Sequence, residues 1–430
     1  MKLESIKQSK AYQTANRFLS FCITQWFFIL LAVFIALAHS FPSFAKEGGN
    51  IRAEYSIQYG AVAMIFLISG LSMSTTDLVK NILHWRAHFT VLTSSFLITS
   101  AIIFGIATAI KACNNPQIDN WLLVGMIVTH ACPTTVSSNV VMTKKAHGND
   151  ILTLCEVFIG NVLGAFITPA LVQMYLTGGW NFGNPVHQPG VKSTISDLYG
   201  NVMKQLGLSV FVPIFVGQVF LNFFPKQVKW CLTKFHSSKI GSLMLLLIMY
   251  QSFSTAFAQN AFEEVSHVSV IFLVFFNIGI YLVFTILVYL YCRPYFVKVA
   301  FEQEPNETSS TLYKLSYTIF KPFYYNRADT VSVMLCGPAK TAALGVSLIS
   351  SQYGAHSLNL GKLLVPLVLY QAEQVITAQV LTTFMAKWID SEKIAQSEDV
   401  ESISPSSTEY VKEKELDIST VRSIISKNSN

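Results

Sequence analysis

The chain has 430 residues, of which 13% are charged and 52% are hydrophobic, and its formal net charge is +6. A soluble protein carries roughly a quarter charged residues, so this composition excludes an ordinary globular domain and places the chain in a lipid bilayer. A bilayer core about 30 Å thick requires about 20 apolar residues in each spanning helix. The sequence therefore predicts ten transmembrane helices, at 23–41, 57–74, 88–110, 121–143, 151–176, 205–224, 240–259, 268–292, 330–351 and 361–388.

Basic residues set the expected orientation of these ten spans. With a cytosolic N-terminus, most lysines and arginines fall in cytosolic loops and ends, as the positive-inside rule requires. Both termini are then cytosolic, and the net charge reflects this asymmetry rather than a nucleic-acid partner. For the first span, a signal peptide cleaved after Ala45 is the alternative, but its apolar run is long enough to cross the membrane.

The spans divide the chain into five regions. A cytosolic N-terminus over 1–22 precedes a first five-helix repeat over 23–176, an outer loop over 177–204, a second five-helix repeat over 205–388 and a cytosolic tail over 389–430. The tail is rich in Ser, Glu and Lys and nearly free of aromatic residues, which predicts disorder. Within it, Ser404 precedes a proline and is a candidate phosphorylation site; a plain solvated tail is the alternative.

Spans four and nine are interrupted in a similar way, span four at Pro133 and span nine at Gly337 and Pro338. Proline removes a backbone donor and clashes with the preceding turn, so each helix should kink or open there. Opened backbone at membrane depth is stable only where it is buried in protein or lines a wet cavity. Matching breaks in the fourth of each five spans predict two inverted repeats whose broken helices cross at the midplane, as in secondary transporters. Ordinary proline kinks are the alternative.

Lys340 lies in the middle of span nine, two residues after Pro338. A charge at the bilayer centre costs several kcal/mol and needs a partner. One interpretation is a structural salt bridge to Glu156 in span five or Glu373 in span ten. The other is that the ammonium holds an anionic group of a solute, and the two can coexist. Thr341, which follows Lys340 in span nine, and Gln374, which follows Glu373 in span ten, join this candidate solute or ion site.

At this point the motifs become specific. The stretches "WLLVGMIVTHACPTTVSSNVVMT", "CGPAKTAALGV" and "LLVPLVLYQAEQVITAQVL" resemble the bile acid:sodium symporter superfamily, and most closely its SBF-like branch of fungal and vertebrate carriers linked to calcium regulation. The resemblance covers about 20–390. It implies an all-α integral membrane protein with ten helices in two inverted repeats, whose helices four and nine cross. The family divides these helices into a panel domain (1, 2, 6 and 7) and a core domain (3–5 and 8–10).

The resemblance also assigns site residues. It places Ser138 and Asn139 where sodium-coupled members have ligands of a first cation site, and Thr153 and Glu156 near further ligands from the fifth helix. Lys340 stands in a segment where those members have a Gln-Asn pair. An ammonium there repels sodium unless a carboxylate offsets it, so sodium is the one cofactor in question.

The resemblance implies a multi-pass carrier in the plasma membrane that restrains cytosolic calcium, with the endoplasmic reticulum or Golgi as the alternative location. Its partners are then the bilayer and a small-molecule or ion solute, here expected to be anionic. Two other interpretations remain: a non-transporting regulator that acts on a calcium-channel partner, and a sodium/organic anion symporter. The sequence contains no HExxH, GxSxG or P-loop motif and no EF-hand, so neither an enzyme nor a metal site is expected.

Overall fold

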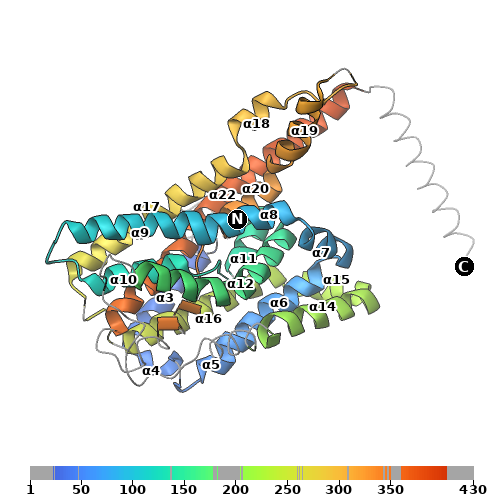
Figure 1. Ribbon diagram of the computed structural model, residues 1–430. Coiled ribbons are helices and arrows are strands. Elements are labelled where there is room, and N and C mark those ends of the chain that lie inside the picture. Colours follow the sequence, from blue (N-terminus) through green and yellow to red (C-terminus); the bar gives the residue numbers. More distant parts are fainter. Residues whose placement is uncertain are drawn as a thin grey trace, which may run out of the picture.

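A computed structural model describes residues 25–46, 48–135, 138–177, 207–258, 265–307, 309–341 and 360–403, with isolated positions 23, 182, 204, 260, 262, 263, 344, 345, 348 and 349. Within these residues the chain forms helices and no strand (Figure 1). The predicted N-terminal region over 1–22, nearly all of the outer loop over 177–204 and the candidate phosphorylation site Ser404 lie outside the described residues.

Every predicted span contains at least one helix. In chain order these are α3 (Trp26–Ser40), α5 (Ala53–Tyr55) with η1 (Ser56–Ala61) and α6 (Val62–Ser72), α8 (Trp85–Leu92) with η2 (Thr93–Ile98) and α9 (Thr99–Ala112), α10 (Asn120–Ala131) with α11 (Ser138–Lys145), α12 (Asp150–Thr177), η3 (Gly207–Phe211) with α14 (Val212–Phe223), α16 (Ser237–Ala258), α17 (His267–Cys292), α20 (Arg327–Cys336) and α22 (Leu360–Ile403).

The helices confirm a multi-pass membrane protein. Among the described residues, five helices are long and apolar enough to cross a bilayer, or up to seven if each bent pair is one span. The helices α3 and α10 are apolar but shorter. The count of ten spans and the inverted repeat stay predictions.

Short helices between the spans were not predicted. They are α4 (Pro42–Ala45), α7 (Thr75–Ile82), α15 (Pro225–Lys234), α18 (Tyr295–Ala300) and α19 (Thr311–Phe320). The axis of α15 turns by 117° from that of the preceding helix. Basic and apolar residues alternate along α15 at helical spacing, which is typical of a helix that lies in the membrane interface.

The last helix, α22, extends beyond residue 388, where the membrane region was predicted to end. α22 continues to Ile403, whereas the tail was expected to begin at 389. The physical reason is that a formed helix extends at little cost once nucleated, and the stretch "SEKIAQSEDV" is rich in helix-forming Glu, Lys, Ala and Gln. A composition that cannot support a packed core can therefore still prolong a helix that already exists.

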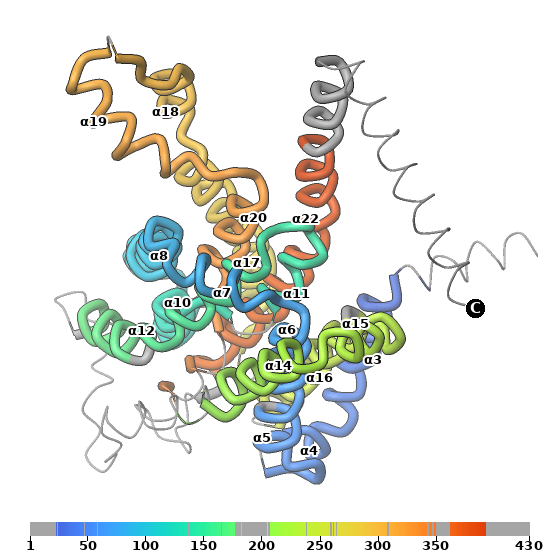
Figure 2. The backbone as a smooth tube through the Cα atoms, turned by 90° about the vertical axis from the view of Figure 1, so that its right-hand side faces the viewer, coloured from blue at the N-terminus to red at the C-terminus, as the bar shows by residue number. Residues whose placement is uncertain are grey.

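The spanning helices pack in two groups, which Figure 2 shows from the side. In the first group, α14 lies along α6 and α16 lies along α3. The Gln218 side chain of α14 stabilises the packing of α14 against α6, because its amide donates to the carbonyl oxygens of Gly70 and Met73, at 2.7 Å each. The second group contains α9, α10, α12, α17, α20 and α22, and α22 packs against both α10 and α17.

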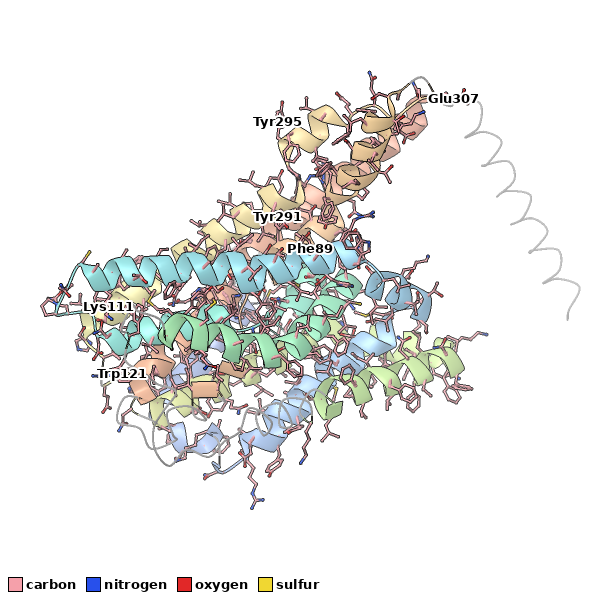
Figure 3. The ribbon with its side chains drawn as sticks, viewed as in Figure 1. Phe89, Lys111, Trp121, Tyr291, Tyr295 and Glu307 are labelled. Atoms are coloured by element: carbon pink, nitrogen blue, oxygen red, sulfur yellow. The ribbon has the colours of Figure 1, made fainter. Side chains whose placement is uncertain are left out.

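The molecule has two distinct ends. Lys111 near the end of α9 and Trp121 at the start of α10 flank a loop that lies at one end of the molecule in Figure 3. Tyr295 and Glu307 lie at the other end, on an arm formed by α18, α19 and the segment between them (Figure 3). The sequence assigns the first loop to the outer side and the second to the cytosol, so opposite ends are what the predicted topology requires.

Candidate functional site

The first helix break follows α10. The helix ends at Ala131, the backbone is extended at the next residue, and α11 begins at Ser138. Pro133 lies in this interruption, and the carbonyl oxygen freed at Ala131 accepts a hydrogen bond from the Thr168 hydroxyl of α12 at 2.9 Å. A side chain from a neighbouring helix thus replaces a lost helical bond, which is how broken helices persist in membranes.

Close packing against α12 holds this break in place. A Cβ atom added at Gly164 would come within 2.6 Å of Pro133 Cγ, so only glycine fits there. The backbone of α12 therefore lies close against the first break at this position. Asn161, one turn earlier, donates from its amide to the Thr134 carbonyl oxygen at 3.0 Å.

The second break follows α20, and the two breaks touch. α20 ends at Cys336, and residues 339–341, which follow Pro338, are not helical. The backbone N–H of Thr341 donates to the carbonyl oxygen of Pro133 at 2.9 Å. The Tyr370 hydroxyl of α22 donates to the carbonyl oxygen of Pro338 at 2.7 Å. The hydrogen bond between Thr341 and Pro133 therefore pairs one polar backbone group of each opened segment, away from water.

Lys340 lies at this crossing, with 1% of its surface exposed. Its ammonium donates to the carbonyl oxygen of Ser95 and to the Ser95 hydroxyl, the latter at 3.0 Å. Its backbone is held by Gln374, which accepts from the Lys340 N–H at 2.8 Å and donates to the Lys340 carbonyl at 2.7 Å. Ser95 belongs to η2, a π-helical segment of the third span. Such segments are rare in proteins, and where they occur they are often part of a functional site.

One interpretation of Lys340, a structural salt bridge, finds no support among the described residues, where the ammonium contacts Ser95. The Glu156 carboxylate oxygen Oε1 instead contacts His88 Nδ1 at 2.7 Å. The Glu373 carboxyl lies beside Asn277 of α17. The undescribed residues between 342 and 359 contain no Asp or Glu, so the chain directly after Lys340 supplies no carboxylate either.

His88 is a residue that sequence reasoning missed. It lies on α8, and its second ring nitrogen Nε2 contacts the carbonyl oxygen of Ile82 at 3.0 Å. That carbonyl can only accept, so Nε2 carries a proton, and the contact with Glu156 then requires one further proton between the two side chains. The sequence feature that could have identified His88 is its spacing from Ser95. It lies seven residues, or two helical turns, before Ser95 and on the same face of the helix.

Comparison with known proteins then decides the family. A family model of SBF-like CPA transporters matches residues 25–387. The chain belongs to this family. Solute carrier RCH1 of Candida albicans is 70% identical over 400 residues, which cover 93% of this chain and 97% of that protein. The protein of the same name in Saccharomyces cerevisiae is 56% identical over 412 residues, covering 94% and 93%. Sodium/bile acid cotransporter 7 of Danio rerio is 27% identical over 367 residues, covering 85% and 94%.

The family's expected cation ligands lie beside the first break. The Asn139 amide donates to the Thr134 hydroxyl at 2.6 Å, and the Thr153 hydroxyl donates to the Thr143 hydroxyl at 3.0 Å. The thiol of Cys336 faces Thr134, Asn139 and Thr153. The structure thus brings Asn139 and Thr153 together, around a cysteine from the second break.

The remaining candidates divide between two places. Ser138 lies at the start of α11, where its hydroxyl donates to Thr135 at 3.1 Å. Glu156 is fully buried, and its second carboxylate oxygen Oε2 has no hydrogen-bond partner among the described residues. Gln374 instead bonds to the backbone of Lys340, and Thr341, the next residue along the chain, bonds to Pro133. The structure therefore separates Ser138 and the buried carboxyl of Glu156 from Lys340.

Proposed function

We propose that this chain is a secondary transporter whose solute carries an anionic group bound at Lys340. The observation that carries the proposal is a buried lysine at the point where two broken helices meet, with no carboxylate among the described residues within ion-pair distance. An uncompensated ammonium at this depth is unfavourable, and an anion would relieve that cost. The family membership supports a carrier of this kind.

The proposal includes the finer architecture expected from the sequence. Ten spans in two inverted repeats would cross at the two breaks near the midplane, with both termini in the cytosol. The first group of helices would form the family's panel, and the second its core. In such carriers one domain rocks against the other around a fixed site, so the site is exposed to each side in turn.

Uptake by reconstituted protein tests the transport proposal. Proteoliposomes that contain the wild-type chain are expected to accumulate at least one radiolabelled organic anion from a panel that includes taurocholate and dicarboxylates. Lys340→Met should abolish that uptake, whereas Lys46→Gln, which alters a lysine far from the crossing, should leave it unchanged. Uptake by Lys340→Met at the wild-type rate would refute the role of this lysine.

A sodium/organic anion symporter is the second candidate. It is favoured by the buried Glu156 oxygen without a partner and by the hydroxyl and amide oxygens of Thr153 and Asn139 nearby. Hard oxygen ligands of this kind suit sodium. Replacing sodium by choline in the uptake assay separates the two candidates, because only the symporter loses uptake.

We further propose that the carrier lowers cytosolic calcium, as the resemblance to calcium-linked SBF-like carriers suggests, and that it acts in the plasma membrane. A carrier acts through its solute, so Lys340→Met should abolish the effect on calcium accumulation in cells that lack the wild-type chain. A non-transporting regulator of a calcium channel would keep its effect in this variant and lose it when the tail after 389 is removed.

A further inference from the structure

The short helix α15 leaves the preceding span at a sharp angle. Its axis turns by 117° from that of the helix before it, which is closer to perpendicular than to parallel. It packs against α14 and α6, and Figures 1 and 2 show it next to α14. Val228 is the buried residue of α15, and the residues on the opposite side of the helix are exposed. One face of α15 is therefore open to the surroundings of the protein.

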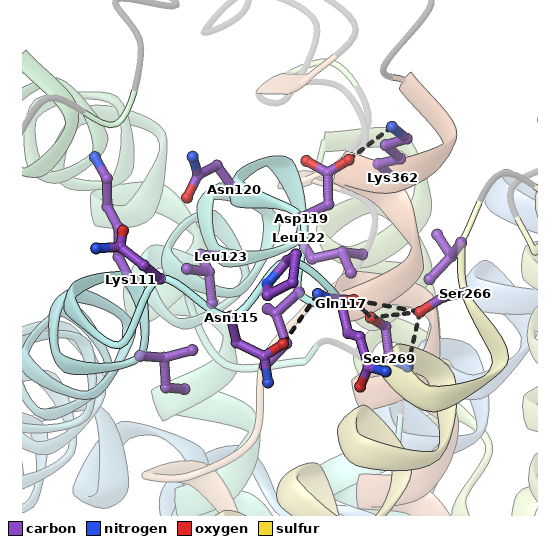
Figure 4. A pocket seen from close by; sticks show the side chains of 15 residues that line it. Lys111, Asn115, Gln117, Asp119, Asn120, Leu122, Leu123, Ser266, Ser269 and Lys362 are labelled. Carbon is purple, nitrogen blue, oxygen red and sulfur yellow. Dashed lines mark hydrogen bonds and ion pairs between the residues drawn. The ribbon is translucent and has the colours of Figure 1, made fainter.

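Exposed lysines on and just after α15 make this surface positive, and they are Lys226, Lys229, Lys234 and Lys239. The chain contains no Asp or Glu from 198 to 262, so no carboxylate lies near them in the sequence. None of the four forms an ion pair with a described residue. By contrast, Lys362 in the pocket at the other end of the molecule is paired with Asp119 at 2.6 Å (Figure 4). Within the described part of the chain, no ion pair offsets the positive charge of α15.

The open face of α15 carries a tryptophan between two lysines. Lys226, Trp230 and Lys234 follow one another at intervals of four residues, so they form a row along one side of the helix. Trp230 lies two residues after the buried Val228, and positions two apart in a helix point in nearly opposite directions. The row therefore faces away from the bundle. Trp230 is 59% exposed, and the Lys234 ammonium lies 4.5 Å from the centre of its ring.

The position and the aromatic residues of α15 indicate a lipid surface. α15 directly follows α14, so it lies at the depth where a predicted span leaves the bilayer. Phe224 and Phe235, at the two ends of α15, are exposed like Trp230. At this depth aromatic rings contact acyl chains, while lysine side chains extend to the phosphate groups. The residues 404–430 are a poorer partner, because they contain four acidic and four basic residues and thus carry no net charge.

We propose that α15 binds the phosphate groups of anionic phospholipids through Lys226, Lys229 and Lys234, with Trp230 in the headgroup layer. The predicted topology places this surface in the cytosolic leaflet, which is the negatively charged one. Since α6 and α14 belong to the first group of helices, bound lipid would hold this group in place while the second group moves. This consequence rests on the transport proposed above, whereas the lipid binding does not.

Fluorescence quenching by brominated lipids tests this binding in the full chain, reconstituted in phosphatidylcholine vesicles at low ionic strength. A fixed fraction of brominated lipid is included as either phosphatidylserine or phosphatidylcholine. The signal of Trp230 is the difference between each protein and the same protein with Trp230→Phe. A lysine near an anionic surface favours binding by about fivefold, so we expect phosphatidylserine to be preferred beside Trp230 by about fivefold or more. Replacing Lys226, Lys229 and Lys234 together by glutamine should abolish this preference.

Control variants separate lipid binding from effects on the fold. Replacing the same three lysines by arginine keeps the charge and should keep the preference. Lys298→Gln removes an exposed lysine of α18 and should leave the preference unchanged. Lys340→Met should also leave it unchanged, so the test does not depend on transport. Salt at 1 M screens charges beyond about 3 Å and should abolish the preference.

Several results would overturn the proposal. They are equal quenching of Trp230 by the two lipids, a preference that survives the glutamine variant or 1 M salt, and a preference that the arginine variant loses. Quenching of Trp230 that begins only after removal of residues 404–430 would instead assign this surface to the tail of the chain.

Discussion

Replacing Lys340 by methionine tests whether the lysine serves the fold or the solute. In a structural salt bridge, Lys340→Met would leave a buried carboxylate without its partner, at a cost of about 3–5 kcal/mol. The structure places both candidate carboxylates elsewhere, Glu156 at His88 and Glu373 beside Asn277. We therefore expect a folded, inactive protein.

The magnitude follows from the contacts that the ammonium makes. Removing a lysine charge from the middle of a span makes insertion of that span into the membrane more favourable by roughly 2.5–3.5 kcal/mol. Against this, the Ser95 hydroxyl loses the bond from Lys340, which costs about 1–3 kcal/mol if it stays unpaired. The Ser95 carbonyl keeps a second donor, the Thr99 hydroxyl at 2.7 Å. Lys340→Met should thus be between neutral and about 2 kcal/mol more stable than the wild type.

Thermal unfolding in detergent, followed by intrinsic tryptophan fluorescence, measures this change. Adding Ser95→Ala to Lys340→Met should raise the stability further, because it removes the unpaired hydroxyl. Lys340→Arg should lose transport while it keeps the charge, since a planar guanidinium cannot reproduce the compact ammonium contacts at Ser95. A loss of more than about 3 kcal/mol in Lys340→Met would refute this reasoning and reveal an unrecognised carboxylate at the lysine.

Three further predictions concern other parts of the chain. Gly125→Ala should cost about 1–3 kcal/mol in unfolding experiments, because its Cβ would lie 2.5 Å from the Leu363 carbonyl oxygen of α22. His88→Ala should destabilise by about 3–5 kcal/mol, since it leaves the buried Glu156 carboxyl without its contact, whereas Glu156→Gln should cost less. A membrane-impermeant maleimide added to intact cells should label Cys113, which is exposed and predicted outside.

Each of these predictions has a matched control within the chain. Gly105→Ala meets no atom within 4 Å, so it should be neutral or slightly stabilising. His147→Gln alters an exposed histidine that contacts Asp390, and it should have little effect on stability. Cys231 is exposed but predicted cytosolic, so the maleimide should reach it only after permeabilisation. Labelling of Cys231 in sealed cells would contradict the ten-span topology.

The positions of the two breaks could be predicted because a proline stands at each of them beside small or polar residues. Pro133 and Pro338 each remove a backbone donor, and α10 and α20 end two residues before them. Proline alone would not have been enough, because Pro169 and Pro366 lie inside the helices α12 and α22. The apolar runs predicted the spans for a similar reason, since bilayer thickness fixes their length. The short helices α18 and α19 could not be predicted in this way, because membrane thickness does not constrain a loop between two spans.

The charge pairing could not be predicted, because it depends on which side chains meet in space. Sequence reasoning weighed only the acids in the spans as partners for Lys340 and gave no weight to neutral oxygen acceptors. Ser95 supplies two such acceptors, one of them a backbone carbonyl that no sequence pattern marks. His88 was overlooked because a lone histidine on an apolar helix is an ambiguous signal, although it determines where Glu156 points.

The third span takes part in both buried contacts that Glu156 and Lys340 make in the second group of helices. The helical run from Trp85 to Ala112 presents His88 to Glu156 and, two turns later, Ser95 to Lys340. Both contacts involve buried groups, so a shift or rotation of this span changes both together, and neither can be broken cheaply alone. The π-helical turn at Ser95 is the place where this span departs from regular geometry. A carrier whose solute displaces Ser95 from Lys340 would thereby act on the Glu156 contact about 10 Å away along the helix.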